Sequence, residues 1–442
     1  MQSSNLMITD MQVFDLDGLP KKITLIKIFT NSGVVGYGEL RDASSRNYAT
    51  MLKSRILGEN PLNIDKIFRK IRQFGNHSRQ GGGVSGVEVA LMDIAGKYWN
   101  VPCWQLMGGK YRDAIRIYCD TDVDAGAGDG GMSMGRALKK RMSDGFTMLK
   151  MDLGIGLLMN MPGMLNAPLG LLDEMKQYAS YTTDVPHGSA QLSDLRWKAY
   201  DLNTMEHPFT GIHITEKGMD YLENYVQTVR SGIGYDIPLA IDHFGHVCAE
   251  DCIRFALRVE KYNLAWFEDP VPWQYTDQYR MIRERTSIPL CTGEDIYGLD
   301  AFKGLIDHHA ISIAHPDVLT AGGMRETKRI GDYAYEHGVA VALHMAESPV
   351  GAMAAVHVGA ALPQLLAMEF HSADTADWQD IVTGLPMPLI QGGFIQVPDK
   401  PGLGIDSLVE DELVRHANAA YPAEWLDTRA WDNEICNDRQ WS

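Results

Sequence analysis

The sequence predicts an α/β fold with two parts, a TIM-type barrel of parallel strands and helices and an α+β module before it. Its 442 residues are enough for a barrel of about 250 residues and a second domain. From Ile115 onward, eight short apolar segments alternate with segments of helical periodicity. Eight strand-then-helix units in one run favour a closed parallel barrel. Before Ile115 the pattern differs, because it combines a hairpin signal with two helices.

The N-terminal region, residues 1–114, is expected to form the α+β module. Ile23–Phe29 and Val34–Gly38 flank a short polar turn that contains glycine, which is typical of a β-hairpin. Ile64–Phe74 and Val84–Tyr98 are expected to be helices, and the second carries one apolar stripe at helical spacing.

The barrel is expected over residues 115–391. Its eight predicted strands are Ile115–Asp120, Met148–Leu153, Leu239–His243, Leu264–Asp269, Leu290–Glu294, Ile311–Asp317, Val339–Met345 and Leu366–Phe370. The predicted helices between them include Ala249–Tyr262, Thr276–Thr286, Leu299–Asp307 and Arg325–His337. A doubly wound open sheet is the alternative. It is less favoured because no Gly-x-Gly-x-x-Gly turn follows the first strand.

Two segments depart from this regular pattern. Residues 154–215 are rich in Met, Gly, Pro and Asn, and the next helix, Glu216–Arg230, begins only after them. This insertion leaves from the end of the second strand, where TIM barrels carry their sites. We therefore expect a lid or a substrate-contacting loop, with a surface or oligomer contact as the alternative. The tail, residues 392–442, is expected to pack on the first module.

Composition limits the possible partners. The formal net charge is −17, which argues against nucleic acid as a partner, since that would require a basic face. An acidic small molecule is not excluded, because one cation can dominate a pocket. No signal peptide or membrane span is predicted. The six cysteines form no Cys-x-x-Cys pair and are expected to be reduced, in a cytoplasmic protein.

Three acidic residues mark the ends of three consecutive predicted strands. Asp242, Glu268 and Glu294 are spaced 26 residues apart, so each lies one strand–helix unit from the next. Equivalent positions on neighbouring barrel strands face the same mouth, and converging carboxylates need a cation in a partly buried site. Oxygen ligands of this kind suit Mg²⁺. The alternative is that each acid merely caps the helix that follows.

Other polar residues end the remaining strands. Lys150 follows an apolar run near the end of the second strand, and strand alternation places Asp152 on the same face. Asp317 ends the sixth strand and His344 the seventh. A carboxylate bonded to a histidine fixes its tautomer and raises its basicity, so this pair is a candidate general base. Glu369 ends the eighth strand and would face the pocket from the remaining side.

Several motifs together resemble one known family. They are Ser85–Lys97 followed by Pro102, Leu106 and Gly108-Gly109, then Glu268-Asp269-Pro270, Gly293-Glu294, and Pro316-Asp317 with Ala321-Gly322-Gly323. In combination they resemble the enolase superfamily and, within it, the mandelate racemase and muconate lactonizing enzyme subgroup. The resemblance covers nearly the whole chain.

The resemblance implies a modified TIM (β/α)7–8β barrel with a capping domain formed by the N-terminal region and the C-terminal tail. The cap would contribute specificity loops near Asp17–Lys22 and Asp42–Tyr48. One Mg²⁺ per subunit is implied, with Asp242, Glu268 and Glu294 as its ligands.

The resemblance also implies the Asp317–His344 pair as general base and Glu369 as an acid donor to the substrate carboxylate. The subgroup often has Lys-x-Lys at the end of the second strand, whereas this chain has Lys150-Met151-Asp152. An Asp beside a lysine and near a metal should have a low pKa. It is therefore a poor second base, although it could act as an acid. This departure favours dehydration of a sugar acid, an aldonate or aldarate, to a 2-keto-3-deoxy acid.

Two other interpretations remain open. A racemase or epimerase, or a cycloisomerase, would share the removal of the α-proton and differ in the fate of the intermediate. A non-catalytic binding protein could retain the same fold. His243, His246 and Trp273 follow the ligand strands and are candidate substrate contacts, with ordinary loop positions as the alternative. Barrels of this family often form octamers, so a homo-oligomer is expected.

Overall fold

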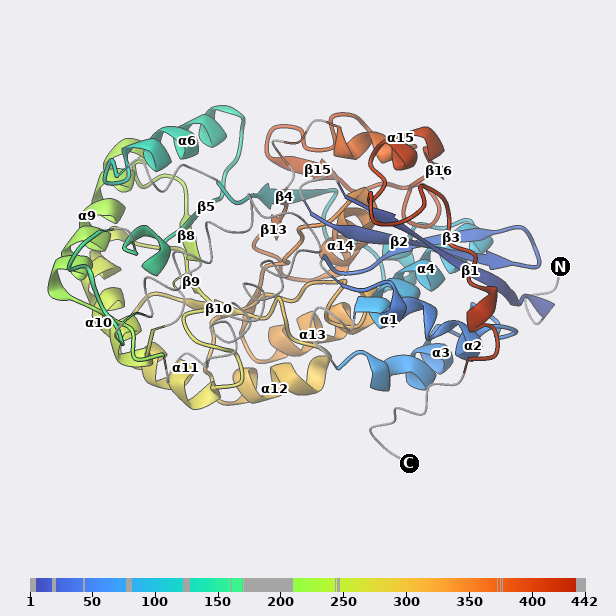
Figure 1. The fold of residues 1–442 in the computed structure, drawn as a ribbon, viewed down its shortest axis with the longest axis horizontal. Coiled ribbons are helices and arrows are strands. Elements are labelled where there is room, and N and C mark those ends of the chain that lie inside the picture. The colour runs from blue at the N-terminus through green and yellow to red at the C-terminus, as the bar shows by residue number, and fades with distance from the viewer. Residues whose placement is uncertain are drawn as a thin grey trace.

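A computed structural model gives the fold, and it describes residues 5–17, 21–42, 44–76, 82–121, 128–159, 161–168, 170, 210–242, 244, 247–371, 373, 375 and 377–434. Figure 1 shows two parts that lie side by side. One is a ring of helices around short parallel strands. The other is an antiparallel sheet with its own helices, beside which the last part of the chain lies. One continuous apolar core runs through both parts.

The N-terminal part is an antiparallel sheet in the order β1-β2-β3 with helices packed against it. Its elements are β1 (Ile8–Leu16), β2 (Ile23–Thr30), β3 (Val35–Glu39), α1 (Asn47–Thr50), α2 (Lys53–Ile56), α3 (Ile64–Ile71), α4 (Gly82–Trp99) and α5 (Cys103–Leu106). Helix α4 and strand β3 approach closely: a Cβ atom on Gly38 would lie 2.1 Å from the carbonyl oxygen of Gly86. This approach depends on glycine at Gly38, and it fixes the end of β3 and the residues that follow it.

Two buried glutamates join the N-terminal part to the barrel. Glu39, the last residue of β3, accepts hydrogen bonds from the backbone N–H groups of Ser348 and Gly351 at the start of one barrel helix. Glu88 of α4 accepts a hydrogen bond of 2.7 Å from the N–H of Met324, which begins another. The first N–H groups of a helix have no partner within the helix, and they carry partial positive charge. Each glutamate therefore satisfies a helix terminus of the barrel.

The barrel strands lie in chain order. They are β4 (Ala114–Tyr118), β5 (Leu149–Asp152), β8 (Leu239–Asp242), β9 (Phe267–Glu268), β10 (Leu290–Thr292), β11 (Ile313–Ala314), β12 (Ala340–Val341) and β13 (Met368–Glu369). Strands β5, β8, β9, β10, β11 and β12 form one parallel sheet. A bridge between Leu343 and Met368 leads to β13, and β13 pairs in parallel with β4. Within the described part of the chain no ladder joins β4 to β5. There, an ion pair of 3.0 Å between Lys150 and Asp120 links the two strand ends.

Helices cover the outside of these strands (Figure 1). They are α6 (Met132–Ser143), α9 (Glu216–Ile233), α10 (Ala249–Val259), α11 (Thr276–Arg283), α12 (Leu299–Asp307), α13 (Met324–Glu336) and α14 (Pro349–Ala361), with short 3-10 turns at Arg72–Phe74, Ile155–Leu157, Glu260–Tyr262, Trp378–Ile381 and Arg429–Trp431. Every residue of α14 is buried, because this helix lies between the barrel and the N-terminal part.

The final segment returns to the N-terminal sheet. It contains β14 (Val382–Thr383), β15 (Phe394–Gln396), β16 (Ser407–Leu408) and α15 (Glu410–Arg415). Strand β15 pairs with β4 of the barrel. Further on, the N–H groups of Asn418 and Leu426 donate to the carbonyl oxygens of Asp15 and Val13 in β1. The tail thus lies along the open edge of β1.

The predicted fold class is confirmed, and each of the eight predicted strand segments overlaps a parallel strand. Helices α6 and α14 were not predicted. In the insertion, residues 171–209 lie outside the described residues, and its two described ends pair as β6 (Leu165–Asn166) and β7 (His213–Ile214). The five described cysteines are free. None of the described helices is both long and apolar enough to cross a membrane.

Candidate active site

The three acids predicted as metal ligands lie at one rim of the barrel. Asp242 is the last residue of β8, Glu268 is the last residue of β9, and Glu294 follows β10 by two residues. These strands are neighbours in the order β10-β9-β8, so their ends share an edge. Burial raises the pKa of Asp269 well above its usual value, and the charges of Glu294, Glu268 and Asp242 add to that rise. All three predicted ligands therefore act electrostatically on one neighbouring carboxyl group.

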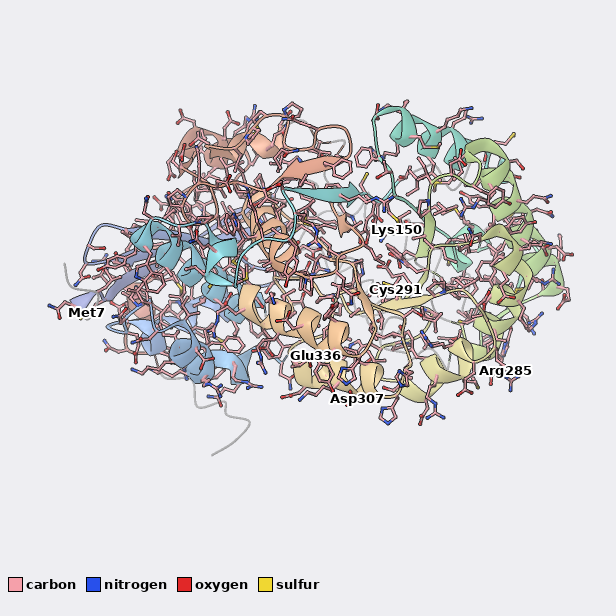
Figure 2. The ribbon with its side chains drawn as sticks, turned by 180° about the vertical axis from the view of Figure 1, so that it is seen from behind. Met7, Lys150, Arg285, Cys291, Asp307 and Glu336 are labelled. Atoms are coloured by element: carbon pink, nitrogen blue, oxygen red, sulfur yellow. The ribbon has the colours of Figure 1, made fainter. Side chains whose placement is uncertain are left out.

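Lys150 of β5 is a buried cation among four of the rim's carboxylates, and Figure 2 shows it within the ring of helices. Its Nζ atom lies 2.5 Å from Glu369, 2.7 Å from Asp242, 3.0 Å from Asp120 and 3.7 Å from Glu268. Burial alone would lower the pKa of Lys150, but these carboxylates outweigh it and raise the pKa well above its usual value. Lys150 is therefore a permanent positive charge.

Asp317 and His344 meet as the sequence suggested. The Nδ1 atom of His344 lies 2.7 Å from Asp317 Oδ2, and the two residues also form a parallel backbone bridge. The other oxygen of Asp317 accepts hydrogen bonds from two backbone N–H groups, which fixes the carboxylate. The Nε2 atom of His344 lies 2.9 Å from Glu294. Burial and Arg41 lower the pKa of His344, whereas Glu294 and Asp317 raise it, and the net shift is upward.

Arg41 is a cation of this site that sequence reasoning missed. It follows β3 of the N-terminal sheet and is fully buried, with Nη1 3.2 Å from Asp317 and 2.7 Å from Glu347, and Nη2 3.7 Å from Glu294. The next residue, Asp42, donates its backbone N–H to the same Glu347. The only sequence signal was a charged residue directly after a buried strand. Through Arg41 the N-terminal part contacts the predicted base and a predicted ligand together.

Glu369 is placed at the site, beside cations that oppose the protonated form an acid donor needs. Burial raises its pKa, yet Lys150 at 2.5 Å and His371 at 3.1 Å lower it further, so the net pKa lies well below the usual value. Tyr118 donates a hydrogen bond of 3.1 Å to its other oxygen, and His315 lies 3.5 Å from that oxygen. These cations therefore oppose protonation of Glu369, and its role as an acid donor stays a prediction.

Of the other predicted site residues, the structure describes Asp152 and Trp273 but not the two histidines. Asp152 lies opposite Asp242 in the β5–β8 ladder, and its ligand atom is within 4.8 Å of those of Asp242 and Asp120. Trp273 lines a cavity of about 550 Å³ together with Asp269, the residue after Glu268. His243 and His246 lie outside the described residues.

The donor set at this rim fits a hard divalent cation. Asp242, Glu268 and Glu294 supply only carboxylate oxygens, which Mg²⁺ prefers. The Oε1 atom of Glu268 is buried and lies 3.0 Å from His315 Nδ1 without the geometry of a hydrogen bond. An unsatisfied buried carboxylate oxygen is costly unless a cation shares its charge. Lys150 already lies near two of the three acids, and His344 and Arg41 lie near the third.

Comparison with known proteins places the chain in a family. Residues 20–108 match the family model of the mandelate racemase / muconate lactonizing enzyme N-terminal domain, and residues 133–411 match the enolase C-terminal domain-like family. The chain is 31% identical over 404 residues to D-xylonate dehydratase of Haloferax volcanii, covering 90% of this chain and 86% of the relative. It is 26% identical over 459 residues to the D-galactonate dehydratase family member RspA of Pantoea ananatis, covering 98% of this chain and 99% of that relative.

A solved structure of a related protein has the same fold. The mandelate racemase/muconate lactonizing enzyme-like protein from Rubrobacter xylanophilus superposes with a TM-score of 0.74 at 26% identity, covering 94% of this chain and 98% of that one. The family match and the two dehydratase relatives support an enzyme of the hydro-lyase class. The chain belongs to the enolase superfamily and, within it, to the mandelate racemase subgroup.

Proposed function

We propose that this enzyme removes the α-proton of a sugar acid, an aldonate or aldarate, and expels the β-hydroxyl as water to give a 2-keto-3-deoxy acid. The observation that carries the proposal is the buried Asp317–His344 pair. It lies on the same barrel rim as Lys150 and the three predicted ligands. A base, a fixed cation and carboxylates for a metal are the groups that this chemistry requires.

The first step is removal of the proton next to the substrate carboxylate. His344 accepts it at Nε2, while Asp317 holds Nδ1 and stabilises the imidazolium that forms. Asp242, Glu268 and Glu294 would hold Mg²⁺, which, when bound, supplies positive charge that stabilises the enediolate. Lys150 adds a fixed positive charge at the same rim. A bound cation would share the charge of Glu294. Glu294 would then no longer raise the pKa of His344, and the imidazole could act as a base.

Elimination is favoured over racemisation by the residue at position 152. A racemase needs a competent proton carrier on each face of the α-carbon. Here Asp152 stands where the subgroup often has a second lysine, so the chain lacks that base. The names of the two relatives make D-xylonate and D-galactonate the first substrates to test.

The test is a screen of aldonates and aldarates with Mg²⁺ present and detection of 2-keto acids. We expect turnover with at least one acid sugar, loss of turnover with a chelator, and recovery when Mg²⁺ is restored. His344→Asn should abolish turnover while Mg²⁺ still raises the melting temperature. Exchange of the α-proton in deuterated water by the wild-type enzyme, with no 2-keto acid from any substrate, would instead indicate a racemase, an epimerase or a cycloisomerase.

A further inference from the structure

A second histidine, His371, lies at the same rim and has no part in the mechanism described so far. It follows β13 by two residues, and its side chain is mostly buried, with 14% exposed. Its ring centre lies 5.5 Å from that of His344. Ligand atoms of His344, Glu369 and His371 lie within 4.8 Å of one another. The two imidazoles are thus close enough to act on neighbouring carbons of one small substrate.

An aspartate holds His371 in the same way that Asp317 holds His344. The Nδ1 atom of His371 lies 2.9 Å from Asp120 Oδ2. Asp120 follows β4 and His371 follows β13, and these two strands are neighbours. Strands β11 and β12 are neighbours too, and Asp317 and His344 follow them by three residues each. The barrel therefore builds the same aspartate–histidine pair twice on its rim. In each pair Nδ1 is bound, which leaves Nε2 for chemistry.

The charges around His371 favour an acid rather than a base. Burial lowers its pKa, but Glu369 and Asp120 raise it more, to about 9. His371 is therefore protonated at neutral pH. Its Nε2 atom lies 3.1 Å from Glu369 in this structure, so a substrate hydroxyl would compete with Glu369 for that proton.

We propose that His371, positioned by Asp120, is the general acid that protonates the departing β-hydroxyl while His344 removes the α-proton. This inference rests on the proposed function, and it assigns to His371 the role of acid that the sequence had suggested for Asp152. His371 touches the leaving group, whereas Asp120 acts through His371 and is a positioning residue.

The α C–H bond breaks, its proton goes to His344 Nε2, and its electron pair enters the enediolate. That pair then forms the double bond between the α- and β-carbons as the β C–O bond breaks. The oxygen keeps the C–O electron pair, takes the Nε2 proton of His371 and leaves as water. The enol takes up a proton at the β-carbon and loses one from its hydroxyl to become the 2-keto acid. Exchange with solvent restores both histidines.

The experiment compares two leaving groups, of which only one needs a proton. Wild type and His371→Asn are assayed with the acid sugar of highest turnover in the screen and with its 3-deoxy-3-fluoro analogue, since fluoride departs without protonation. We expect His371→Asn to slow water loss by about 10²-fold or more and fluoride loss by less than about tenfold. It should still exchange the α-proton in deuterated water. Asp120→Asn should show the same preference for fluoride.

Two variants serve as controls. His344→Asn should lose both eliminations and the exchange, because it removes the base. His337 directly follows α13, so His337→Asn should match wild type in both eliminations and in the exchange. Equal slowing of both substrates by His371→Asn, or loss of α-proton exchange, would mean a structural or second-base role and overturn the inference. Retained water loss would also overturn it. If wild type converts no acid sugar, the proposed function itself fails and this inference fails with it.

Discussion

Replacing Arg41 with leucine tests how the N-terminal part is coupled to the barrel. Arg41 is fully buried and lies 2.7 Å from Glu347 and 3.2 Å from Asp317. Leucine keeps much of the apolar packing but leaves these carboxylates buried without their cation. Removing one partner of a buried ion pair costs about 3–5 kcal/mol. An unfolding entropy of about 2.1 cal/mol/K per residue gives roughly 0.9 kcal/mol/K for this chain. The melting temperature should therefore fall by about 3–5 °C.

Differential scanning calorimetry measures this shift, and two further variants isolate its cause. Glu347→Gln in the Arg41→Leu background removes one unpaired charge and should recover at least about 1 kcal/mol, since contacting residues are energetically coupled. Arg72→Leu is the matched control. Among the described residues, the Arg72 side chain makes only an exposed ion pair of 3.5 Å, with Asp300. Its loss should therefore change stability by less than about 0.5 kcal/mol. A fall of less than 1 °C for Arg41→Leu, or no recovery in the double variant, would refute the reasoning.

The remaining predictions concern charge. Lys150→Met should lower kcat by about 10²-fold or more, because it removes a fixed charge near the developing enediolate; steady-state 2-keto acid assays measure this, and unchanged kcat would contradict it. Mg²⁺ at a hundred times its Kd should stabilise the fold by about 2.7 kcal/mol, seen as a rise in melting temperature that Asp242→Asn abolishes. Burial raises the pKa of Glu88 from 4.5 to about 7, although backbone N–H groups oppose the rise. The stability that protonated Glu88 contributes is present below pH 4.5 and is lost as the pH rises through about 7. The free energy of unfolding, measured with urea, should fall less between pH 5 and pH 8 for Glu88→Gln than for wild type.

The barrel could be predicted because its strands are short apolar runs with polar residues directly after them. That pattern also located the candidate site, since the ends of parallel strands meet at one rim. Asp242, Glu268 and Glu294 were predicted as ligands by their equal spacing, and the Asp317–His344 pair by its position on adjacent strands. Such spacing can be counted directly along the chain, so the sequence alone was enough for these predictions.

Other features depend on packing that periodicity does not record. Helix α14 is buried on every side, so its sequence has no apolar stripe confined to one face. Arg41 comes from the N-terminal sheet, and only the docking of that sheet brings it to Asp317. His371 could have been suspected, because strand alternation places it on the same side as Glu369. The contact of 2.5 Å between Glu369 and Lys150 could not, since it depends on how two distant segments pack together.

Charge balance connects the proposals. Lys150 and Arg41 each lie within 4 Å of four carboxyl groups among the described residues: Asp120, Asp242, Glu268 and Glu369 for Lys150, and Asp42, Glu294, Asp317 and Glu347 for Arg41. Two permanent cations cannot balance eight acids, and a sugar acid adds another negative charge. Favourable binding of that anion therefore requires further positive charge at the rim. A divalent cation on the three predicted ligands and a protonated His371 would provide it, so the metal and the second histidine answer the same electrostatic need.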